Sequence, residues 1–204
     1  MIRTVEETRS TNDDVLGLAR GGAPEGLWLR AERQTGGRGR QGRDWQSPPG
    51  NLYASTLVRL RPNDPPAPTL AMVAAVALHE ALGLSAPGQS FVIKWPNDIL
   101  AGGAKLAGIL LERADDAVVI GIGVNLAYHP EDLGRPVTSL AALAGASPEG
   151  GIFVEMLADT FARWLARWRS DGLEPVRTRW LAAAHPIGTA VSTPEGHGLF
   201  VGLD

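Results

Sequence analysis

The stretch Gln34-Thr35-Gly36-Gly37-Arg38-Gly39-Arg40-Gln41-Gly42-Arg43-Asp44-Trp45 places three arginines among four glycines and ends on a tryptophan. Glycines let a backbone turn tightly and bring its N–H groups close to a ligand. The guanidinium groups of Arg38, Arg40 and Arg43 are planar forks that match carboxylate and phosphate oxygens. We interpret the stretch as an anion-binding loop; a solvated, flexible basic loop is the alternative.

The segments on either side of this loop are predicted strands. Leu27–Glu32 alternates between apolar and polar residues, and Asn51–Leu60 is rich in β-branched and aromatic residues. The loop therefore lies at a strand end, where sheet proteins commonly carry ligand-binding groups.

Polar residues near the N-terminus form a second candidate site. A short strand is predicted over Ile2–Glu7, followed by a helix that starts near Ser10 and stops at Gly21-Gly22. Ser10, Thr11 and Asn12 are N-cap residue types, and the acids after them suit the positive end of a helix dipole. These three residues either only cap the helix or also line a ligand site.

Three successive strands, joined as a meander, are predicted in the middle of the chain. They cover Phe91–Leu100 with a turn at Pro96, Lys105–Glu112 after a hairpin tip at Gly102-Gly103, and Val118–Asn125. Gly121 and Gly123 alternate on the last strand, so one face lacks side chains there and another group can lie against the backbone. This pattern predicts the floor of a pocket.

The remaining elements are mostly helical. The apolar segment Pro68–Leu82, which ends at Gly83, predicts a buried helix. Other predicted elements are a long loop over 126–136, a short helix capped by Thr138 and ending at Gly145, helices over Ile152–Trp168 and Glu174–Ala184, and two strands over Ile187–Val191 and Leu199–Leu203.

Composition narrows the class of protein. The 204 residues, 44% of them hydrophobic, suit one domain of ordinary size. The absence of cysteine excludes disulfides, a thiolate zinc site and a cysteine nucleophile. No apolar run approaches membrane-spanning length and the N-terminus lacks the features of a signal peptide, so we expect a cytoplasmic protein without a membrane role.

Charge also carries information. The net charge is −3, so a nucleic-acid role would need a local basic patch. Lysine occurs only at positions 94 and 105, beside 17 arginines, and is too rare here to serve as general solubilising charge. The histidines lack metal-ligand spacing, and the chain contains neither a P-loop nor a complete dinucleotide fingerprint.

Five motifs together resemble the catalytic domain of biotin-protein ligases, in type and in order along the chain. They are Ser10-Thr11-Asn12, Gln34–Trp45, Lys94–Asp98, Lys105–Leu110 and Gly121–Asn125. The resemblance extends from the first strand to about Trp180. It implies an α+β fold like that of class II aminoacyl-tRNA synthetases, with helices packed on a mixed, largely antiparallel sheet, over residues 1–184. It also implies a partial SH3-like β domain over residues 185–204.

The resemblance implies an ATP-dependent ligase that activates biotin as an adenylate and assigns roles to the motif residues. Catalytic roles fall to Lys105, Arg40 and Asp98. Biotin contacts fall to Ser10, Thr11, Asn12, Gln34, Gly37, Arg38, Gly39, Arg40, Lys105 and Gly108, with Gly121 and Gly123 leaving room for the ligand. Nucleotide contacts fall to Arg38, Arg40, Arg43, Trp45, Lys94, Asn97 and Asn125, and the loop after Asn125 is expected to close over the adenylate.

Magnesium is expected with ATP, and its protein ligands are unknown; Asp98 is a candidate. Asp98 could instead be only a turn residue after Pro96-Asn97. The implied partner is a biotin carboxyl carrier protein, which accepts biotin on a lysine. The sequence leaves the oligomeric state undecided, with a homodimer as one possibility, and no nucleic-acid partner is expected.

Two other functions compete with this hypothesis. A lipoate or octanoate ligase or transferase has the same fold and also handles a carboxylate on an acyl chain; the dense Arg/Gly spacing of Gln34–Trp45 favours the biotin branch. A non-enzymatic Arg/Gly nucleic-acid-binding module is the other, and the negative net charge and the separate lysine motifs argue against it.

Overall fold

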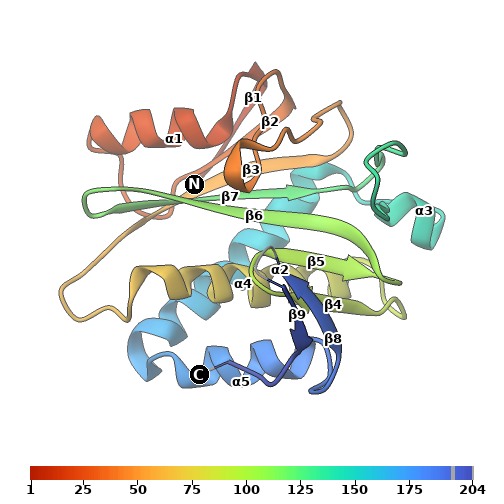
Figure 1. Cartoon of the computed structure of the whole chain (residues 1–204). Coiled ribbons are helices and arrows are strands. Elements are labelled where there is room, and N and C mark those ends of the chain that lie inside the picture. Colours follow the sequence, from red (N-terminus) through yellow and green to blue (C-terminus); the bar gives the residue numbers. More distant parts are fainter. Residues whose placement is uncertain (194–195, 204) are drawn as a thin grey trace.

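A computed structural model describes residues 1–193 and 196–203 of the chain. Its centre is a seven-stranded sheet in the order β1-β2-β3-β7-β6-β5-β4 (Figure 1). The strands are β1 (Ile2–Thr8), β2 (Trp28–Gln34), β3 (Leu52–Arg59), β4 (Phe91–Lys94), β5 (Asp98–Ala101), β6 (Ala104–Ala114) and β7 (Ala117–Val124). β1 and β2 are parallel and the other neighbours are antiparallel, which confirms the mixed, largely antiparallel sheet.

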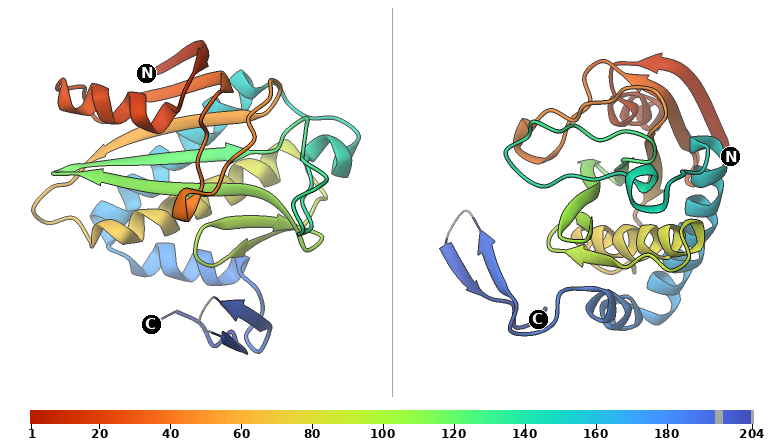
Figure 2. Two further views of the ribbon diagram at one scale, coloured as in Figure 1. Left: turned by 45° about the horizontal axis from the view of Figure 1, so that its top comes forward. Right: turned by 90° about the vertical axis from the view of Figure 1, so that its right-hand side faces the viewer.

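Helices cover both faces of the sheet (Figures 1 and 2). Alternate residues of a strand point to opposite faces of the sheet, and two consecutive residues of β7 pack in the cores on the two faces. Ile120 packs in the large core with α2 (Leu70–Ser85) and α4 (Gly150–Asp171). Val119 packs in a smaller core with residues of α1 (Thr11–Arg20). The α1 face is therefore only partly covered, and that is where a cavity can form.

The predicted start of α1 is confirmed. Ser10 is the N-cap, and its Oγ accepts a hydrogen bond from the Asp13 backbone N–H at 3.4 Å. Asp13 and Asp14 occupy the first turn, at the positive end of the helix dipole. The cap places Thr11 and Asn12 in the first turn of the helix, and both residues are buried.

The predicted end of α2 at Gly83 is wrong, because the helix continues to Ser85. Burial of its apolar side chains overrides the weak preference of glycine against helix. The prediction that no apolar run approaches membrane-spanning length is also wrong: Ala67–Ser85 is 19 residues long with a mean hydropathy of 1.5. In the fold this segment lies in the core, where Val73 and Leu78 are fully buried, and its apolar composition is explained by that packing.

The segment predicted as one interrupted strand, Phe91–Leu100, is instead a hairpin. β4 and β5 are antiparallel, with Lys94 opposite Asp98. The chain reverses through Trp95, Pro96 and Asn97, and the peptide bond before Pro96 is cis. The meander thus has four strands, and the hairpin brings its turn to the edge of the cavity described below.

The short helix α3 (Leu140–Ala144) is capped by Ser139 and not by Thr138 as predicted. The Oγ of Ser139 accepts a hydrogen bond from Ala142 N at 3.3 Å. Thr138 lies one residue before the cap, and its backbone N–H donates to the Lys105 carbonyl at 2.9 Å. Thr138 therefore belongs to the loop that joins β7 to α3.

The C-terminal strands lie at other positions than predicted. After α5 (Glu174–Ala183), β8 (Ala190–Thr193) pairs with β9 (Gly196–Leu199) in a separate two-stranded sheet. Phe200 packs on Trp180 of α5 with ring centroids 6.2 Å apart, and Arg177 donates to the Leu203 carbonyl. These contacts hold 200–203 against α5, outside the strand pairing. The partial SH3-like domain over 185–204 stays a prediction; residues 194, 195 and 204 lie outside the described residues.

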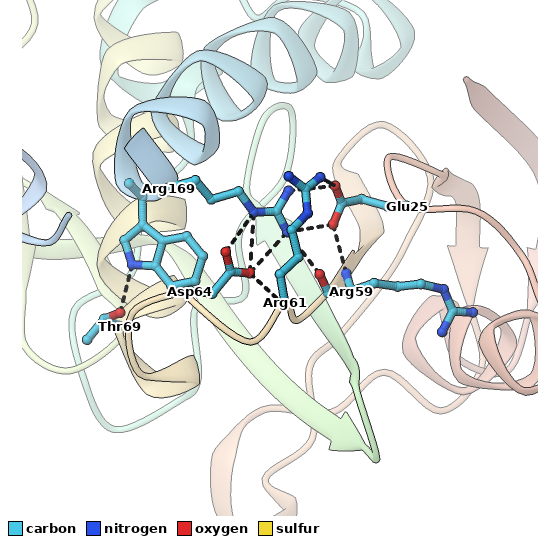
Figure 3. Close-up of polar contacts among 7 residues, drawn as sticks. Glu25, Arg59, Arg61, Asp64, Thr69 and Arg169 are labelled. Atoms are coloured by element: carbon cyan, nitrogen blue, oxygen red, sulfur yellow. Dashed lines mark hydrogen bonds and ion pairs between the residues drawn. The ribbon is translucent and has the colours of Figure 1, made fainter. Parts of the chain in front are cut away.

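A dense ion-pair network ties α4 to the sheet (Figure 3). Arg169, near the end of α4, donates to both carboxylate oxygens of Glu25 at 2.6 and 2.8 Å. It also donates to Asp64 at 3.2 Å and to the Arg59 carbonyl at 2.9 Å. Its side chain is only 13% exposed. The network joins segments before β2 and after β3, at the ends of these strands opposite to the Gln34–Trp45 loop.

Candidate active site

A cavity of about 600 Å³ opens on the α1 face of the sheet. Its walls are the loop after β2, the start of α1, the β4–β5 hairpin and strands β6 and β7. The loop after β7 extends on the same side of the sheet (Figure 2). The predicted site residues that line this cavity are Ser10, Thr11, Asn12, Gln34, Arg38, Gly39, Arg40, Arg43, Trp45, Lys94, Asn97, Asp98, Lys105 and Gly108.

Two predicted site residues lie outside the cavity lining. Gly37 is buried behind the loop, where a Cβ would lie 2.7 Å from Ser47 Oγ, so glycine permits the loop to pack there. Asn125 is 3% exposed, and its Nδ2 donates to the Thr138 carbonyl at 3.0 Å. In this structure Gly37 shapes the loop after β2, and Asn125 holds the loop after β7.

A continuous set of hydrogen bonds forms the polar end of the cavity. Gln34 Oε1 accepts from the backbone N–H of Thr11 at 2.8 Å. Ser55 Oγ lies 2.7 Å from Thr11 Oγ1 and donates to Asn12 Oδ1 at 2.6 Å. Asn12 Nδ2 donates to Glu112 Oε2 at 2.7 Å. Ser55 and Glu112 were not predicted from the sequence; a serine within the β-rich stretch Asn51–Leu60 was the one available signal.

The glycine face of β7 receives two side chains of the site itself. A Cβ on Gly121 would lie 2.3 Å from Asn12 Oδ1, and one on Gly123 would lie 2.7 Å from the Trp45 indole. Gly108 on β6 also faces Trp45, at 3.2 Å. These glycines make room for Asn12 and Trp45, and they also line the cavity themselves. That this face leaves room for the ligand stays a prediction.

Lys105 and Asp98 form an ion pair of 2.5 Å in the cavity wall. Their side chains are 13% and 19% exposed. Burial lowers the pKa of the Lys105 ammonium, while the Asp98 carboxylate acts in the opposite direction. The Lys105 Nζ also lies 5.4 Å from the centroid of the Trp45 ring, a cation–π contact. The two residues were predicted as catalytic in separate roles, and the structure brings them into contact; these roles stay predictions.

Arg38 lines the cavity, but its guanidinium fork is occupied by a carboxylate. It donates to both oxygens of Asp13 at 2.9 and 2.6 Å, and Glu112 lies 3.5 Å away. Hydrogen bonding to Asp13 raises the pKa of Arg38 and lowers the pKa of Asp13. Arg38 therefore ties the loop after β2 to the first turn of α1, and an anion at this position would have to share it with Asp13.

Three other cavity arginines are free of carboxylates among the residues that the structure describes. Arg40 donates to Asn97 Oδ1 at 3.4 Å, and Arg43 donates to Gln41 Oε1 at 3.0 Å. The third, Arg135, belongs to the loop after β7 and was not predicted as a site residue. This loop is fixed to the cavity wall by two backbone hydrogen bonds to Lys105. The Lys105 N–H donates to the Pro136 carbonyl at 3.0 Å, and the Thr138 N–H donates to the Lys105 carbonyl at 2.9 Å.

A model of the Biotin/lipoate A/B protein ligase family matches residues 5–125, more than half of the chain. The chain belongs to this family. It is 44% identical over 212 residues to the biotin–[acetyl-CoA-carboxylase] ligase of Paracoccus denitrificans, covering 97% of this chain and 88% of that protein. It is 36% identical to the bifunctional ligase/repressor BirA of Bacillus subtilis, and this alignment covers 95% of this chain and 62% of BirA.

Solved structures of the same family share the fold. The biotin protein ligase from Aquifex aeolicus in complex with biotin and ATP superimposes with a TM-score of 0.86 at 26% identity, covering all of this chain and 88% of that one. The Leishmania major biotin protein ligase in complex with biotinyl-5-AMP gives a TM-score of 0.78 at 27% identity, covering 97% and 93%. The α+β fold expected from the sequence is confirmed.

For a member of this ligase family, magnesium is expected with the nucleotide. No group of three or more histidine and carboxylate side chains that could hold a metal ion occurs within residues 1–193 and 196–203. Asp98 is paired with Lys105, and Asp13 and Glu112 are engaged by Arg38. These side chains do not form a metal site of their own; Mg²⁺ in such enzymes usually keeps several waters and is held by substrate phosphates together with only one or two carboxylates.

Proposed function

We propose that the protein is a biotin–[biotin carboxyl carrier protein] ligase, which forms biotinyl-5′-AMP from biotin and ATP and transfers biotin to a lysine of the carrier. One observation carries the proposal: a single cavity joins a polar hydrogen-bonded end, a buried Lys105–Asp98 pair and an arginine-rich loop. The three parts fit the head group, the reacting carboxylate and the phosphates in turn.

The polar end suits a ureido group. A buried urea needs paired donors and acceptors, because an unpaired polar group in an apolar site costs free energy. Thr11, Asn12 and Gln34 line this end of the cavity and offer hydroxyl and amide groups, and the buried Ser55 behind them completes the network. The walls beyond it include the Trp45 indole and Leu110, which can contact the apolar part of biotin.

The first chemical step joins two anions. A biotin carboxylate oxygen uses a lone pair to bond the α-phosphorus of ATP, the bond from that phosphorus to the bridging oxygen breaks, and pyrophosphate leaves with the electron pair. No proton is transferred. Positive side chains must offset the repulsion between carboxylate and phosphate, most of all where water is excluded. Lys105 and Arg40 line the cavity and can do so.

The second step transfers biotin to the carrier. The neutral amine of the acceptor lysine attacks the acyl carbon of the adenylate, the carbon–oxygen bond to phosphate breaks, and AMP leaves. The amine loses a proton, and the proposed acceptor is Asp98, a partly buried carboxylate that lines the cavity. The loop after β7, which carries Arg135 to the cavity, would shield the mixed anhydride from water.

Other parts of the assignment follow from this function. Magnesium would arrive with the ATP phosphates, and the protein would act in the cytoplasm. The partner would be the carrier domain that presents the acceptor lysine. A homodimer and the absence of nucleic-acid binding stay predictions.

A lipoate or octanoate ligase is the second candidate, since the family includes both activities. The tail of octanoate and the ring of lipoate lack the donors and acceptors of a ureido group. Either one would leave the network of Thr11, Asn12 and Gln34 without a matching partner, which disfavours its binding.

Two measurements test the assignment. A thermal-shift comparison should show that biotin raises the melting temperature more than lipoate or octanoate at equal concentration, because a ligand stabilises the state it binds. Pyrophosphate release should then require biotin, ATP and Mg²⁺ together. Release with lipoate or octanoate and none with biotin would assign the protein to the second candidate.

A further inference from the structure

The positive charges in the cavity differ in how far they are already neutralised. Arg38 is bound by Asp13, and Lys105 is bound by Asp98. Arg40 and Arg43 contact only neutral amide oxygens. The last arginine of the lining, Arg135, forms no hydrogen bond or ion pair with any residue in the described part of the chain.

Arg135 is brought to the cavity by a loop that is anchored directly to the candidate catalytic lysine. The Lys105 backbone N–H donates to the Pro136 carbonyl, and the Thr138 N–H donates to the Lys105 carbonyl, in a parallel bridge between Lys105 and Val137. Pro136 follows Arg135 in sequence, so the guanidinium is tethered one residue from this anchor. The anchor itself belongs to β6, so the edge of the sheet positions Arg135.

We propose that Arg135 is a catalytic residue that contacts the phosphates of ATP and stabilises the charge that builds up as pyrophosphate departs. This inference rests on the proposed function and adds a residue to it. A guanidinium can donate two parallel hydrogen bonds to a phosphate, and a side chain without a carboxylate partner gives up no ion pair when it does so.

The electrostatics of the wall agree with this placement. Arg135 and Arg43 both act to lower the pKa of Lys105, so their positive charges reach the lysine. In the absence of an anion these like charges repel one another. A polyphosphate between them converts repulsion into attraction, which favours ATP in the cavity with the loop closed over it.

The experiment compares Arg135→Ala and Arg135→Lys with two control variants. Leu133→Ala changes an exposed side chain of the same loop, and Arg3→Ala removes one exposed positive charge outside the cavity lining. Pyrophosphate release is measured against ATP concentration at saturating biotin. We expect Arg135→Ala to lower kcat/KM for ATP by about 10- to 100-fold, with Arg135→Lys between it and the parent. Both controls should stay within about twofold of the parent.

A purely structural role for Arg135 predicts a different result. Biotin affinity without nucleotide, measured by calorimetry, should be unchanged in Arg135→Ala if the residue acts on ATP. The proposal is overturned if kcat/KM for ATP is unchanged, or if biotin binding weakens by the same factor as turnover. If the parent releases no pyrophosphate with biotin, the proposed function fails instead. Binding of a non-hydrolysable ATP analogue then decides on Arg135: weaker binding by Arg135→Ala supports the contact, and equal binding refutes it.

Discussion

Lys105 and Asp98 hold each other at 2.5 Å between adjacent strands, with both charges mostly out of solvent. The register explains the pair: Asp98 begins β5 opposite Gly108, and Lys105 lies near the start of the neighbouring β6, with a register shift between Ile99 and Leu100. The glycine lets the lysine side chain pass, because a Cβ at 108 would lie 3.3 Å from Lys105 Nζ. The ammonium is thus fixed before any substrate arrives.

Lys105→Ala should reduce biotin-dependent pyrophosphate release by about 100- to 1,000-fold, since it removes the charge at the reacting carboxylate. It also leaves Asp98 partly buried without a partner, so stability should fall. The double variant Lys105→Ala/Asp98→Ala separates the two effects. Its melting temperature should recover toward that of the parent while its activity stays low. Recovery of activity in the double variant would contradict a direct catalytic role for Lys105.

The rate of adenylation should decline at alkaline pH before a normal lysine would titrate. Burial lowers the pKa of Lys105 from its ordinary value of 10.5, and only the protonated amine can offset phosphate charge. As pH rises through this lowered pKa, the cation and the rate are lost together. Asp98→Asn removes the carboxylate that opposes this lowering of the Lys105 pKa, so the alkaline limb of the pH–rate profile should move to lower pH. A limb that stays in place in this variant would assign the titration to another group.

Gly121→Ala should damage the polar end of the cavity. The added methyl would lie 2.3 Å from Asn12 Oδ1, so the amide must move away from Ser55 and Glu112. We expect a loss of stability of about 1–3 kcal/mol and weaker biotin binding, measured by thermal unfolding and calorimetry. Gly83→Ala is the matched control, because it adds the same methyl to α2 where nothing lies within 4 Å. It should stabilise the protein by about 0.5–1 kcal/mol.

Local patterns in the sequence were enough to predict the elements that end at the site. The cap at Ser10 was predictable because its hydrogen bond spans three residues. The glycines of β7 predicted a face without side chains. Their occupants could not be predicted, because Asn12 reaches Glu112 across 100 residues of sequence through the register of the sheet. Asp13 was interpreted only as a helix-dipole acid, and its pairing with Arg38 depends on how the loop folds back.

The β4–β5 hairpin and the position of the loop after β7 could not be predicted from the sequence, because both depend on contacts with β6. The turn at Pro96 was visible, but whether the chain resumes or reverses depends on β6 being available to pair with β5. Arg135 lay in a stretch without periodicity and enters the cavity only because its loop pairs with the Lys105 backbone. Residues in such loops need the tertiary structure before they can be assigned to a site.

Arg40→Gly should release the adenylate faster without unfolding the protein. The side chain is exposed and makes one hydrogen bond of 3.4 Å to Asn97, so its loss costs little stability. Removing its charge should weaken retention of biotinyl-5′-AMP by about 10-fold or more. Gel filtration of the loaded enzyme measures the retained adenylate, and labelling of a bystander protein measures its escape. Retention equal to that of the parent would remove Arg40 from the set of adenylate contacts.

The Arg169 network should contribute stability that depends on pH (Figure 3). Hydrogen bonding to Arg169 lowers the pKa of Glu25 below its ordinary 4.5, so this carboxylate stabilises the fold above that pH. The contribution is lost as pH falls through the lowered pKa, where Glu25 is protonated in the folded state. Arg169→Met should therefore cost about 2–4 kcal/mol at pH 7 and flatten the decline in stability below pH 5.

Arg167→Met, on the exposed side of the same helix, is the control and should change stability by less than about 0.5 kcal/mol. Chemical unfolding at pH 7 and at acid pH tests both, and an equal acid decline in the parent and in Arg169→Met would assign the pH dependence to other carboxylates.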